Sequence, residues 1–182
     1  MRNVKWEITM SEQAVIEKLK KIKLFGKLGG DAERLAKLAR IVTWQKCKAG
    51  DEVLSEGTEG NELYILQKGA VRVIKRTLNQ ERYTIVSLKD EEDAFFGELA
   101  LLDQEVRSAS VIAETDCEFL VINQEDFNQL GEEDPRLGLL VTRGIGKELS
   151  KRLRKANEDM VILFQALVEQ VAESGGLEEG EG

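Results

Sequence analysis

Apolar residues in the N-terminal part of the chain recur at the spacing of one helix face. Between residues 11 and 23 they are Val15, Ile16, Leu19 and Ile22. Ser11 precedes this run and is a residue type that caps helix N-termini through its hydroxyl. The stretch "LFGKLGG" interrupts the spacing, and Asp31 then precedes "AERLAKLAR" as a second cap. The pattern therefore predicts two short helices with a glycine-rich break between them.

From Ile41 onward apolar and polar residues alternate, which is the period of a β-strand. The alternation continues through "IVTWQKC", "GDEVLSEGTEGNELYILQKGAVRVIKR", "ERYTIVSLK" and "SVIAETDCEFLVI". Glycines mark the turns between these segments, at Gly50, Gly57, Gly60 and Gly69. Short strands at close spacing favour a small antiparallel roll or barrel over parallel strands with crossover helices. We therefore expect a mainly β fold with flanking helices.

The C-terminal part of the chain predicts a long helix. The stretch "QEDFNQL" returns to helical spacing, and after Pro135 the chain reads as one helix from residue 136 to about 171. Pro135 fits the first turn of this helix, where its missing N–H does least harm. Gly144 and Gly146 each weaken a helix by about 1 kcal/mol relative to Ala. We therefore expect a bend at these two glycines.

A heptad seam follows the two glycines. Its members alternate at spacings of four and three: Leu149, Leu153, Ala156, Met160, Leu163 and Leu167. Such a seam joins helices in coiled coils. The helix could instead pack on the roll of its own chain, but it is longer than the roll, so its distal half needs another partner. We predict a homodimer through parallel helices, and interpret the basic run "KELSKRLRK" as a solvated face.

The absence of histidine excludes several kinds of site. The 182 residues include no histidine and only two cysteines, Cys47 and Cys117. A Ser-His-Asp triad, a histidine base and a histidine metal or haem ligand are therefore excluded. Two thiols are too few for an all-cysteine zinc or iron–sulfur site, and we interpret both as packed free thiols. No other catalytic motif is present, so we expect neither an enzyme nor a metal site.

Charge and hydropathy limit the partners. A net charge of −8 argues against general nucleic-acid binding. The tail "ESGGLEEGEG", residues 173–182, carries four of the negative charges, and we expect it to be disordered. The apolar runs are shorter than a bilayer span, and "MRNVKWEITM" has no apolar signal region. We therefore predict a cytoplasmic protein without a membrane partner.

The stretch "FFGELALLDQEVRSAS", residues 95–110, places an acid and a base on either side of an apolar turn. Gly97 lets the backbone approach a ligand, and "ELALL" forms a short helical turn whose free N–H groups suit phosphate. Glu98 would accept hydrogen bonds from a sugar hydroxyl, and Arg107 would neutralise a phosphate through two parallel donors. Ser108 adds a hydroxyl. These residues fit a ribose phosphate, but a Glu98–Arg107 ion pair between a loop and a strand explains them equally well.

On these residues the chain resembles the cyclic nucleotide-binding domain family, shared by catabolite activator regulators, cyclic-nucleotide-dependent kinases and gated channels. "FGELALL…VRSAS" is similar to the family's phosphate-binding cassette. The glycine spacing of "GDEVLSEGTEGNELYILQKGAVRV", the stretch "CEFLVINQEDF" and the N-terminal "LKKIKLF" also match, over residues 11 to about 160. The resemblance implies an eight-stranded antiparallel β-roll, jelly-roll-like (a double-stranded β-helix), with N-terminal helices and a long C-terminal helix.

The resemblance also implies ligand-binding roles. Glu98 would bind the ribose 2′-hydroxyl, and Arg107 the exocyclic phosphate oxygens. The remaining residues of the phosphate cradle would be Gly97, Leu99, Ala100, Ser108 and Ala109, and the roll residues facing the base would be Val71 and Leu88. Candidates to cap the base are Arg143, Lys147 or a neighbouring apolar residue.

Two positions depart from the family pattern or leave it ambiguous. Val106 stands where many members have proline before the arginine, which implies a looser loop. Ser108 stands where a threonine in some members favours cGMP, so we expect cAMP as the effector ligand and no other cofactor.

The resulting hypothesis is a regulatory sensor in three parts. Residues 1–134 would form the roll with its N-terminal helices, residues 135–172 the dimerisation or lid helix, and residues 173–182 the acidic tail. The chain ends shortly after the helix, so we expect no DNA-binding domain and no direct DNA binding. Ligand binding would shift "QEDFNQL" and then the long helix, which an unidentified protein partner would read. The alternative is a dimeric scaffold whose pocket is unused or holds another anion.

Overall fold

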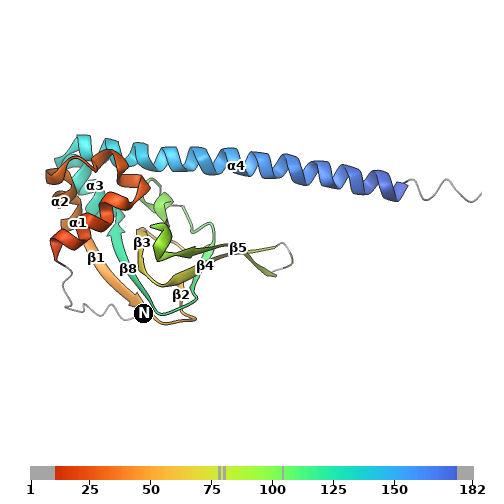
Figure 1. The fold of residues 1–182 in the computed structure, drawn as a ribbon, viewed down its shortest axis with the longest axis horizontal. Helices are drawn as coiled ribbons and strands as arrows, with labels where there is room; N and C mark the ends of the chain where they lie inside the picture. The colour runs from red at the N-terminus through yellow and green to blue at the C-terminus, as the bar shows by residue number, and fades with distance from the viewer. Residues whose placement is uncertain (1–10, 78, 80, 104, 176–182) are drawn as a thin grey trace, which may run out of the picture. The chain divides into compact units, whose positions relative to one another are not determined.

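The computed structural model describes residues 11–175, apart from 78, 80 and 104. The helical elements in this part of the chain are α1 (Glu12–Lys21), η1 (Lys23–Leu28), α2 (Ala32–Arg40), η2 (Asp90–Glu92), η3 (Glu98–Leu101), α3 (Gln124–Glu133) and α4 (Pro135–Gly175). The strands are β1 (Val42–Cys47), β2 (Glu52–Leu54), β3 (Glu62–Lys68), β4 (Ala70–Arg76), β5 (Arg82–Lys89), β6 (Phe95–Phe96), β7 (Ser110–Ala113) and β8 (Cys117–Asn123). Figure 1 shows these elements along the chain.

The strands form two four-stranded sheets, with orders β1-β8-β3-β6 and β2-β7-β4-β5. All the pairings are antiparallel. Each sheet therefore combines strands that are distant in the sequence, as in a jelly-roll. The predicted fold class, a mainly β eight-stranded roll with N-terminal helices and a long C-terminal helix, is confirmed.

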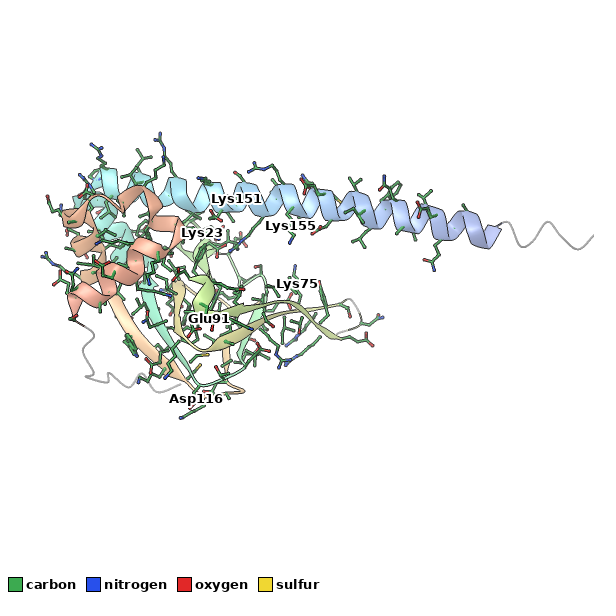
Figure 2. The ribbon with its side chains drawn as sticks, viewed as in Figure 1. Lys23, Lys75, Glu91, Asp116, Lys151 and Lys155 are labelled. Carbon is green, nitrogen blue, oxygen red and sulfur yellow. The ribbon has the colours of Figure 1, made fainter. Side chains whose placement is uncertain are left out.

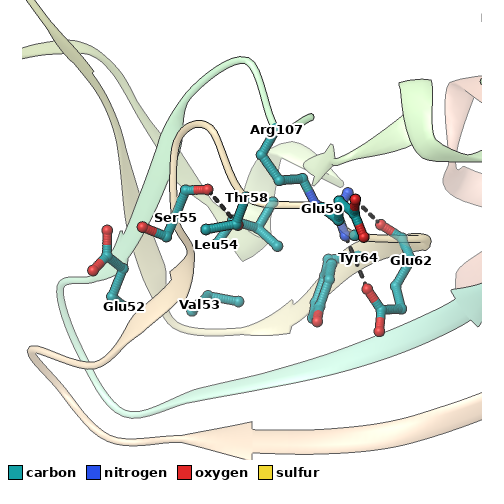
Figure 3. Close-up of a pocket in the computed structure, with 10 residues that line it drawn as sticks. Glu52, Val53, Leu54, Ser55, Thr58, Glu59, Glu62, Tyr64 and Arg107 are labelled. Carbon is teal, nitrogen blue, oxygen red and sulfur yellow. Dashed lines mark hydrogen bonds and ion pairs between the residues drawn. The ribbon is translucent and has the colours of Figure 1, made fainter. Parts of the chain in front are cut away.

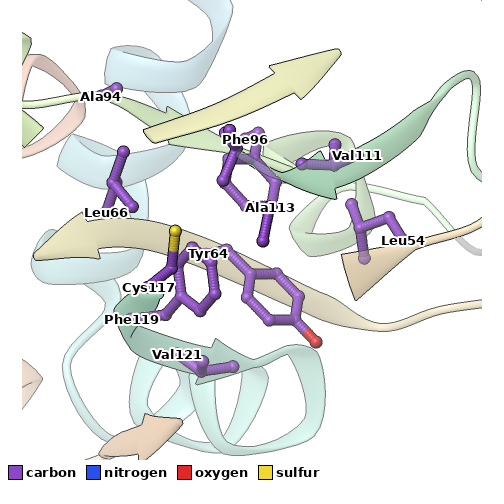
Figure 4. Close-up of a cluster of buried hydrophobic side chains, with 11 residues drawn as sticks. Leu54, Tyr64, Leu66, Ala94, Phe96, Val111, Ala113, Cys117, Phe119 and Val121 are labelled. Atoms are coloured by element: carbon purple, nitrogen blue, oxygen red, sulfur yellow. The ribbon is translucent and has the colours of Figure 1, made fainter. Parts of the chain in front are cut away.

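The roll encloses a cluster of buried side chains, drawn in Figure 4. Tyr64 stacks on Phe96 with ring centroids 5.4 Å apart, and both rings meet Phe119 edge-on. These rings come from β3, β6 and β8, so the cluster joins strands across one sheet. From the other sheet Val71 is fully buried in the cluster, and Leu88, its register partner on β5, packs against it.

The two cysteines face each other across neighbouring strands. Cys47 on β1 is the register partner of Cys117 on β8. Both are free thiols, which agrees with the prediction, although no sequence pattern indicates that they lie opposite each other. Burial, with the nearby Cys117 as a second cause, raises the pKa of Cys47 to about 12. This thiol is therefore protonated and unreactive at neutral pH.

The N-terminal helices begin at the predicted caps. Ser11 Oγ accepts a hydrogen bond from the Ala14 amide, and Asp31 Oδ1 accepts one from the Arg34 amide. The apolar face of α1 buries Val15 and Leu19. The glycine-rich break between the two helices forms η1.

Asp134 fixes the start of α4. Its carboxylate accepts hydrogen bonds from the Leu137 amide and from Arg34 and Lys37 of α2, each at 3.1 Å. Burial alone would raise the pKa of this carboxyl, but these hydrogen bonds outweigh it and lower the pKa of Asp134 to about 2. The carboxylate therefore stays charged and ties α2 to the first turn of α4.

The described part of the chain divides into two compact units, one that ends at Ile145 and one that begins at Gly146. The division falls within α4, and the predicted boundaries before residues 135 and 173 stay predictions. In the first unit α4 buries Leu137, Val141 and Ile145. A Cβ at Gly144 would meet the backbone carbonyl of Leu24. The helix continues through Gly144 and Gly146 without interruption, and Gly144 allows its close packing on Leu24. The predicted bend at the two glycines stays a prediction.

The second unit, taken by itself, is the distal part of α4 in the residues described. Its large apolar side chains from Leu153 to Val171 are 52% to 71% exposed. Charged side chains such as Lys151 and Lys155 project from the same helix (Figure 2). Of the predicted acidic tail, residues 173–175 still belong to α4, and residues 176–182 lie outside the described residues. In the part of the chain that is described, no helix has the length and apolar character needed to cross a membrane.

Candidate functional site

A pocket of about 260 Å³ opens beside β2 and the start of β3. It is drawn in Figure 3, and its lining residues are Glu52, Val53, Leu54, Ser55, Thr58, Glu59, Gly60, Glu62, Tyr64 and Arg107. Most of these residues come from one segment of the chain, β2 with the loop that follows it and the start of β3. Arg107 alone comes from elsewhere, the segment between η3 and β7. The position of Arg107 in the pocket therefore depends on the contacts that hold the segment between η3 and β7 against the β2–β3 loop.

Backbone hydrogen bonds hold Arg107 against the β2–β3 loop. The Arg107 amide donates to the Thr58 carbonyl at 2.8 Å, and the Gly57 amide donates to the Arg107 carbonyl at 2.9 Å. These two bonds fix the residue on both sides of its Cα. The side chain is consequently directed into the pocket.

The guanidinium of Arg107 is buried and bonded to Glu62. Only 6% of its side chain is exposed. Nη1 donates to the Glu62 carbonyl and Nη2 to Glu62 Oε2, both at 2.9 Å. Nη1 also lies 3.5 Å from the Gly97 carbonyl oxygen. A buried charge must be paired to be tolerated, and Glu62 supplies both the negative charge and a neutral acceptor.

Two glycines give the guanidinium its space. A Cβ at Gly60 would lie 2.6 Å from Nη2 of Arg107. A Cβ at Gly97 would lie 2.8 Å from the Glu62 carbonyl oxygen and 3.0 Å from Nη1 of Arg107. Gly97 also has a φ of 76°, which favours glycine. Any larger residue at either position would displace the arginine.

The pocket carries more negative than positive charge. Three carboxylates line it, those of Glu52, Glu59 and Glu62, against the single guanidinium of Arg107. Oε1 of Glu52 is buried and has no hydrogen-bond partner among the described residues. Burial, followed by the charge of Glu62, raises the pKa of Tyr64 to about 12. The tyrosine hydroxyl is therefore neutral and adds no charge.

Of the nine predicted site residues, Arg107 is the one that lines this pocket. Gly97 contacts Arg107, and Glu98 is buried at the start of η3. Leu99 and Ser108 are exposed, and Ala109 is half-buried. The amide of Ala100 donates to the Gly97 carbonyl at 3.2 Å, so it is not a free phosphate donor in this state.

Val71 and Leu88 lie in the core cluster and do not line the pocket. Their predicted role, facing a base, would require the ligand to reach into the roll beyond the pocket. The predicted base-capping candidates, Arg143 and Lys147, are exposed residues of α4.

Sequence reasoning missed Glu62, the ion-pair partner of Arg107. The alternative to ligand binding was an ion pair between Glu98 and Arg107, whereas the ion pair that the structure shows joins Arg107 to Glu62. The two residues are 45 positions apart, and no spacing rule connects them. The signal available was weak: Glu62 is an acidic residue at the head of an apolar strand.

The described residues contain no cluster of three or more histidine, cysteine or acidic residues that could hold a metal ion. A buried, oriented guanidinium in a pocket is instead suited to bind an anion. The family profile of the cyclic nucleotide-binding domain matches residues 44–134, half of the chain. The chain belongs to the cyclic nucleotide-binding domain family. The matched stretch includes the whole pocket and η3.

Individual relatives agree with the family assignment. The domain is 36% identical to human cGMP-dependent protein kinase 2 over 98 residues, which are 53% of this chain and 13% of the kinase. It is 33% identical to the cyclic AMP receptor protein of Thermus thermophilus over 114 residues, which are 63% of this chain and 50% of that protein. The domain therefore spans half or less of the length of these relatives.

Solved structures confirm the fold. The catabolite activator protein of Thermus thermophilus superposes with a TM-score of 0.68 at 29% identity, over 78% of this chain and 62% of that one. A cyclic nucleotide-binding domain from Methylobacillus flagellatus gives the same TM-score and identity over 79% of both chains. The similarity thus covers more of this chain than the family profile does.

Proposed function

We propose that this cyclic nucleotide-binding regulatory domain binds cAMP in preference to cGMP, with Arg107 as the anchor for the cyclic phosphate. The supporting observation is the buried guanidinium that two backbone hydrogen bonds and Glu62 orient in the pocket. Arginine is matched to phosphate because its planar donors bind two oxygens at once. The preference for cAMP rests on Ser108, which replaces the threonine that favours cGMP in some family members.

The remaining contacts form one hypothesis with Arg107. Glu98 would accept the ribose 2′-hydroxyl, and the cradle residues Gly97, Leu99, Ala100, Ser108 and Ala109 would surround the phosphate. The Ala100 amide would have to exchange its bond to the Gly97 carbonyl for a phosphate oxygen. Val71 and Leu88 would contact the base. The cytoplasmic location also stays a prediction.

The output of the domain would pass through α4. The exposed apolar residues beyond Gly146 include the predicted seam members Leu153, Met160, Leu163 and Leu167. Large exposed apolar surfaces on a protein mark interaction sites. We infer that two chains pair through this seam, with a further protein partner reading the dimer. Members of this family are typically regulatory modules and not enzymes, and ligand binding here would act by favouring one arrangement of the helices.

Thermal unfolding of the chain with cAMP, cGMP or 5′-AMP tests the proposal. A ligand at a hundredfold excess over its dissociation constant adds about 2.7 kcal/mol of stability. In a chain of this size the unfolding midpoint should then rise by about 5–10 °C. We expect the largest shift with cAMP, a smaller shift with cGMP and none with 5′-AMP. Equal shifts with cAMP and cGMP would remove the preference, and no shift with any nucleotide would favour a scaffold whose pocket is unused.

A further inference from the structure

Arg107 already has a counter-ion before any ligand is bound. A guanidinium has five N–H donors. The end formed by Nη1 and Nη2 is occupied by the Glu62 carbonyl and by Glu62 Oε2, each at 2.9 Å. A phosphate at Arg107 would therefore join a guanidinium whose charge one carboxylate has already balanced.

The carboxylates around the guanidinium also disfavour a ligand that carries more than one negative charge. Glu62, Glu59 and Glu52 line the pocket with Arg107, so the formal count is three negative charges against one positive. Glu62 is the acid in direct contact, and its side chain is 34% exposed, so water screens it only in part. A second negative charge on a ligand would meet the same carboxylates as the first.

From this arrangement we propose that Glu62 makes the site discriminate between phosphates by their charge. Glu62 would admit a singly charged phosphodiester, such as a cyclic nucleotide, and exclude a doubly charged phosphomonoester, such as the 5′-nucleotide formed when the ring is opened. This inference rests on the proposed function, because it assigns the selectivity of the same site.

The size of the effect follows from the charges. A cyclic nucleotide carries one negative charge, whereas a phosphomonoester carries nearly two at pH 7 because its second pKa is about 6. The Coulomb energy is proportional to the product of the two charges. A change at Glu62 that strengthens binding of the single charge by about tenfold should therefore strengthen binding of the double charge by about a hundredfold.

The test is to measure dissociation constants of cAMP and 5′-AMP by calorimetry, in the wild-type chain and in Glu62→Gln. Where 5′-AMP binds too weakly to titrate, its competition against bound cAMP gives the constant. Glutamine keeps the size of the side chain and can still accept the hydrogen bond from Nη2. We expect both ligands to bind more tightly to the variant. The dissociation constant of 5′-AMP divided by that of cAMP should fall by about tenfold.

A third ligand separates charge from shape. Adenosine 5′-methyl phosphate has the open chain of 5′-AMP but only one negative charge. Glu62→Gln should improve the affinity for this methyl ester by the same factor as the affinity for cAMP. The affinity for 5′-AMP should improve by a larger factor. If Glu62→Gln improves binding of the methyl ester as much as binding of 5′-AMP, the site distinguishes acyclic from cyclic phosphates and not their charges. That result would overturn the proposal.

Glu59→Gln is the matched control, because Glu59 lines the same pocket without a bond to Arg107. It should change the ratio of the two constants less than Glu62→Gln does. An equal change in both variants would overturn the assignment to Glu62. Weaker cAMP binding by Glu62→Gln would mean that Glu62 only positions Arg107, which would also overturn it. If neither the wild-type chain nor the variant binds a cyclic nucleotide, the proposed function fails first.

Discussion

The roll and the distal part of α4 depart from ordinary burial in opposite directions. In the roll, Arg107 and Glu98 are charged residues with less than a tenth of their surface exposed. In α4 beyond Gly146, apolar residues such as Leu163 and Phe164 are 71% and 64% exposed. Buried charge and exposed large apolar groups are the two informative exceptions to the general pattern of protein surfaces.

The two regions would bind their partners for different physical reasons. The roll already balances the charge of its buried arginine through Glu62, so a ligand there meets a guanidinium that has a counter-ion. The distal helix offers its apolar residues to water, so any partner that covers them gains hydrophobic free energy directly. A ligand should therefore be selected by charge in the roll, whereas a partner should be selected by shape and apolar area on the helix.

The largest effect is expected on the helix, from Leu163→Lys. In the proposed parallel dimer each chain would lose a buried leucine. Replacing a buried leucine even by alanine costs about 2–5 kcal/mol. The two lysines would also face each other across the seam. We expect the dimer to dissociate to a monomer with an unchanged roll, as measured by light scattering after gel filtration and by circular dichroism.

Ile162→Lys is the control for this change. Ile162 is 62% exposed and directly precedes Leu163, but consecutive helix residues point about 100° apart, so it falls outside the seam. This variant should remain dimeric at the same concentration. Dissociation of both variants, or of neither, would contradict the seam.

A smaller effect is expected in the roll, from Arg107→Ala. Removing one partner of a buried charged contact costs about 2–5 kcal/mol of binding free energy. We expect the dissociation constant of cAMP to rise by at least thirtyfold, about 2 kcal/mol, in calorimetric titrations. Glu62 is partly exposed and can be solvated by water once the arginine is removed, so the fold should persist.

Arg72→Ala provides the matched arginine. Arg72 pairs with Glu114 at 3.2 Å on β4, with 45% of its side chain exposed. Exposed pairs of this kind contribute about 0–1 kcal/mol, so this variant should bind cAMP as the wild-type chain does. If the two arginine variants bind equally well, Arg107 is not the anchor.

The sequence predicted the features that depend on local periods and local chemistry. Alternation from Ile41 and the glycine turns indicated the roll, and Ser11 and Asp31 indicated the helix starts, because each signal lies within a few residues of what it controls. Arg107 stood out for the same reason, beside the turn at Glu98. The eight-strand topology came from the family resemblance and not from the residues alone.

What the sequence could not predict depends on strand register. Glu62 reaches Arg107 only because the Thr58 and Gly57 backbones hold the segment after η3. Cys47 faces Cys117 only because β1 pairs with β8. Neither contact follows from spacing along the chain. The sequence also cannot show what lies beside a glycine, which is why the packing role of Gly144 was missed.

The smallest effect should come from substitutions of the two glycines of α4, which test the packing role of Gly144. Gly144→Ala places a Cβ against the Leu24 carbonyl, and overpacking of this kind costs about 1–3 kcal/mol. Gly146→Ala has no atom within 4 Å of the new Cβ and should stabilise the helix by up to about 1 kcal/mol.

Chemical denaturation should therefore move the two variants in opposite directions, Gly144→Ala to a lower midpoint and Gly146→Ala to a higher one. If both glycines served only to bend the helix, both alanines would stabilise it in the same way. A gain in stability from Gly144→Ala would thus contradict the close approach of α4 to η1. The opposite signs would show that one glycine is needed for packing and that the other is only a weak helix former.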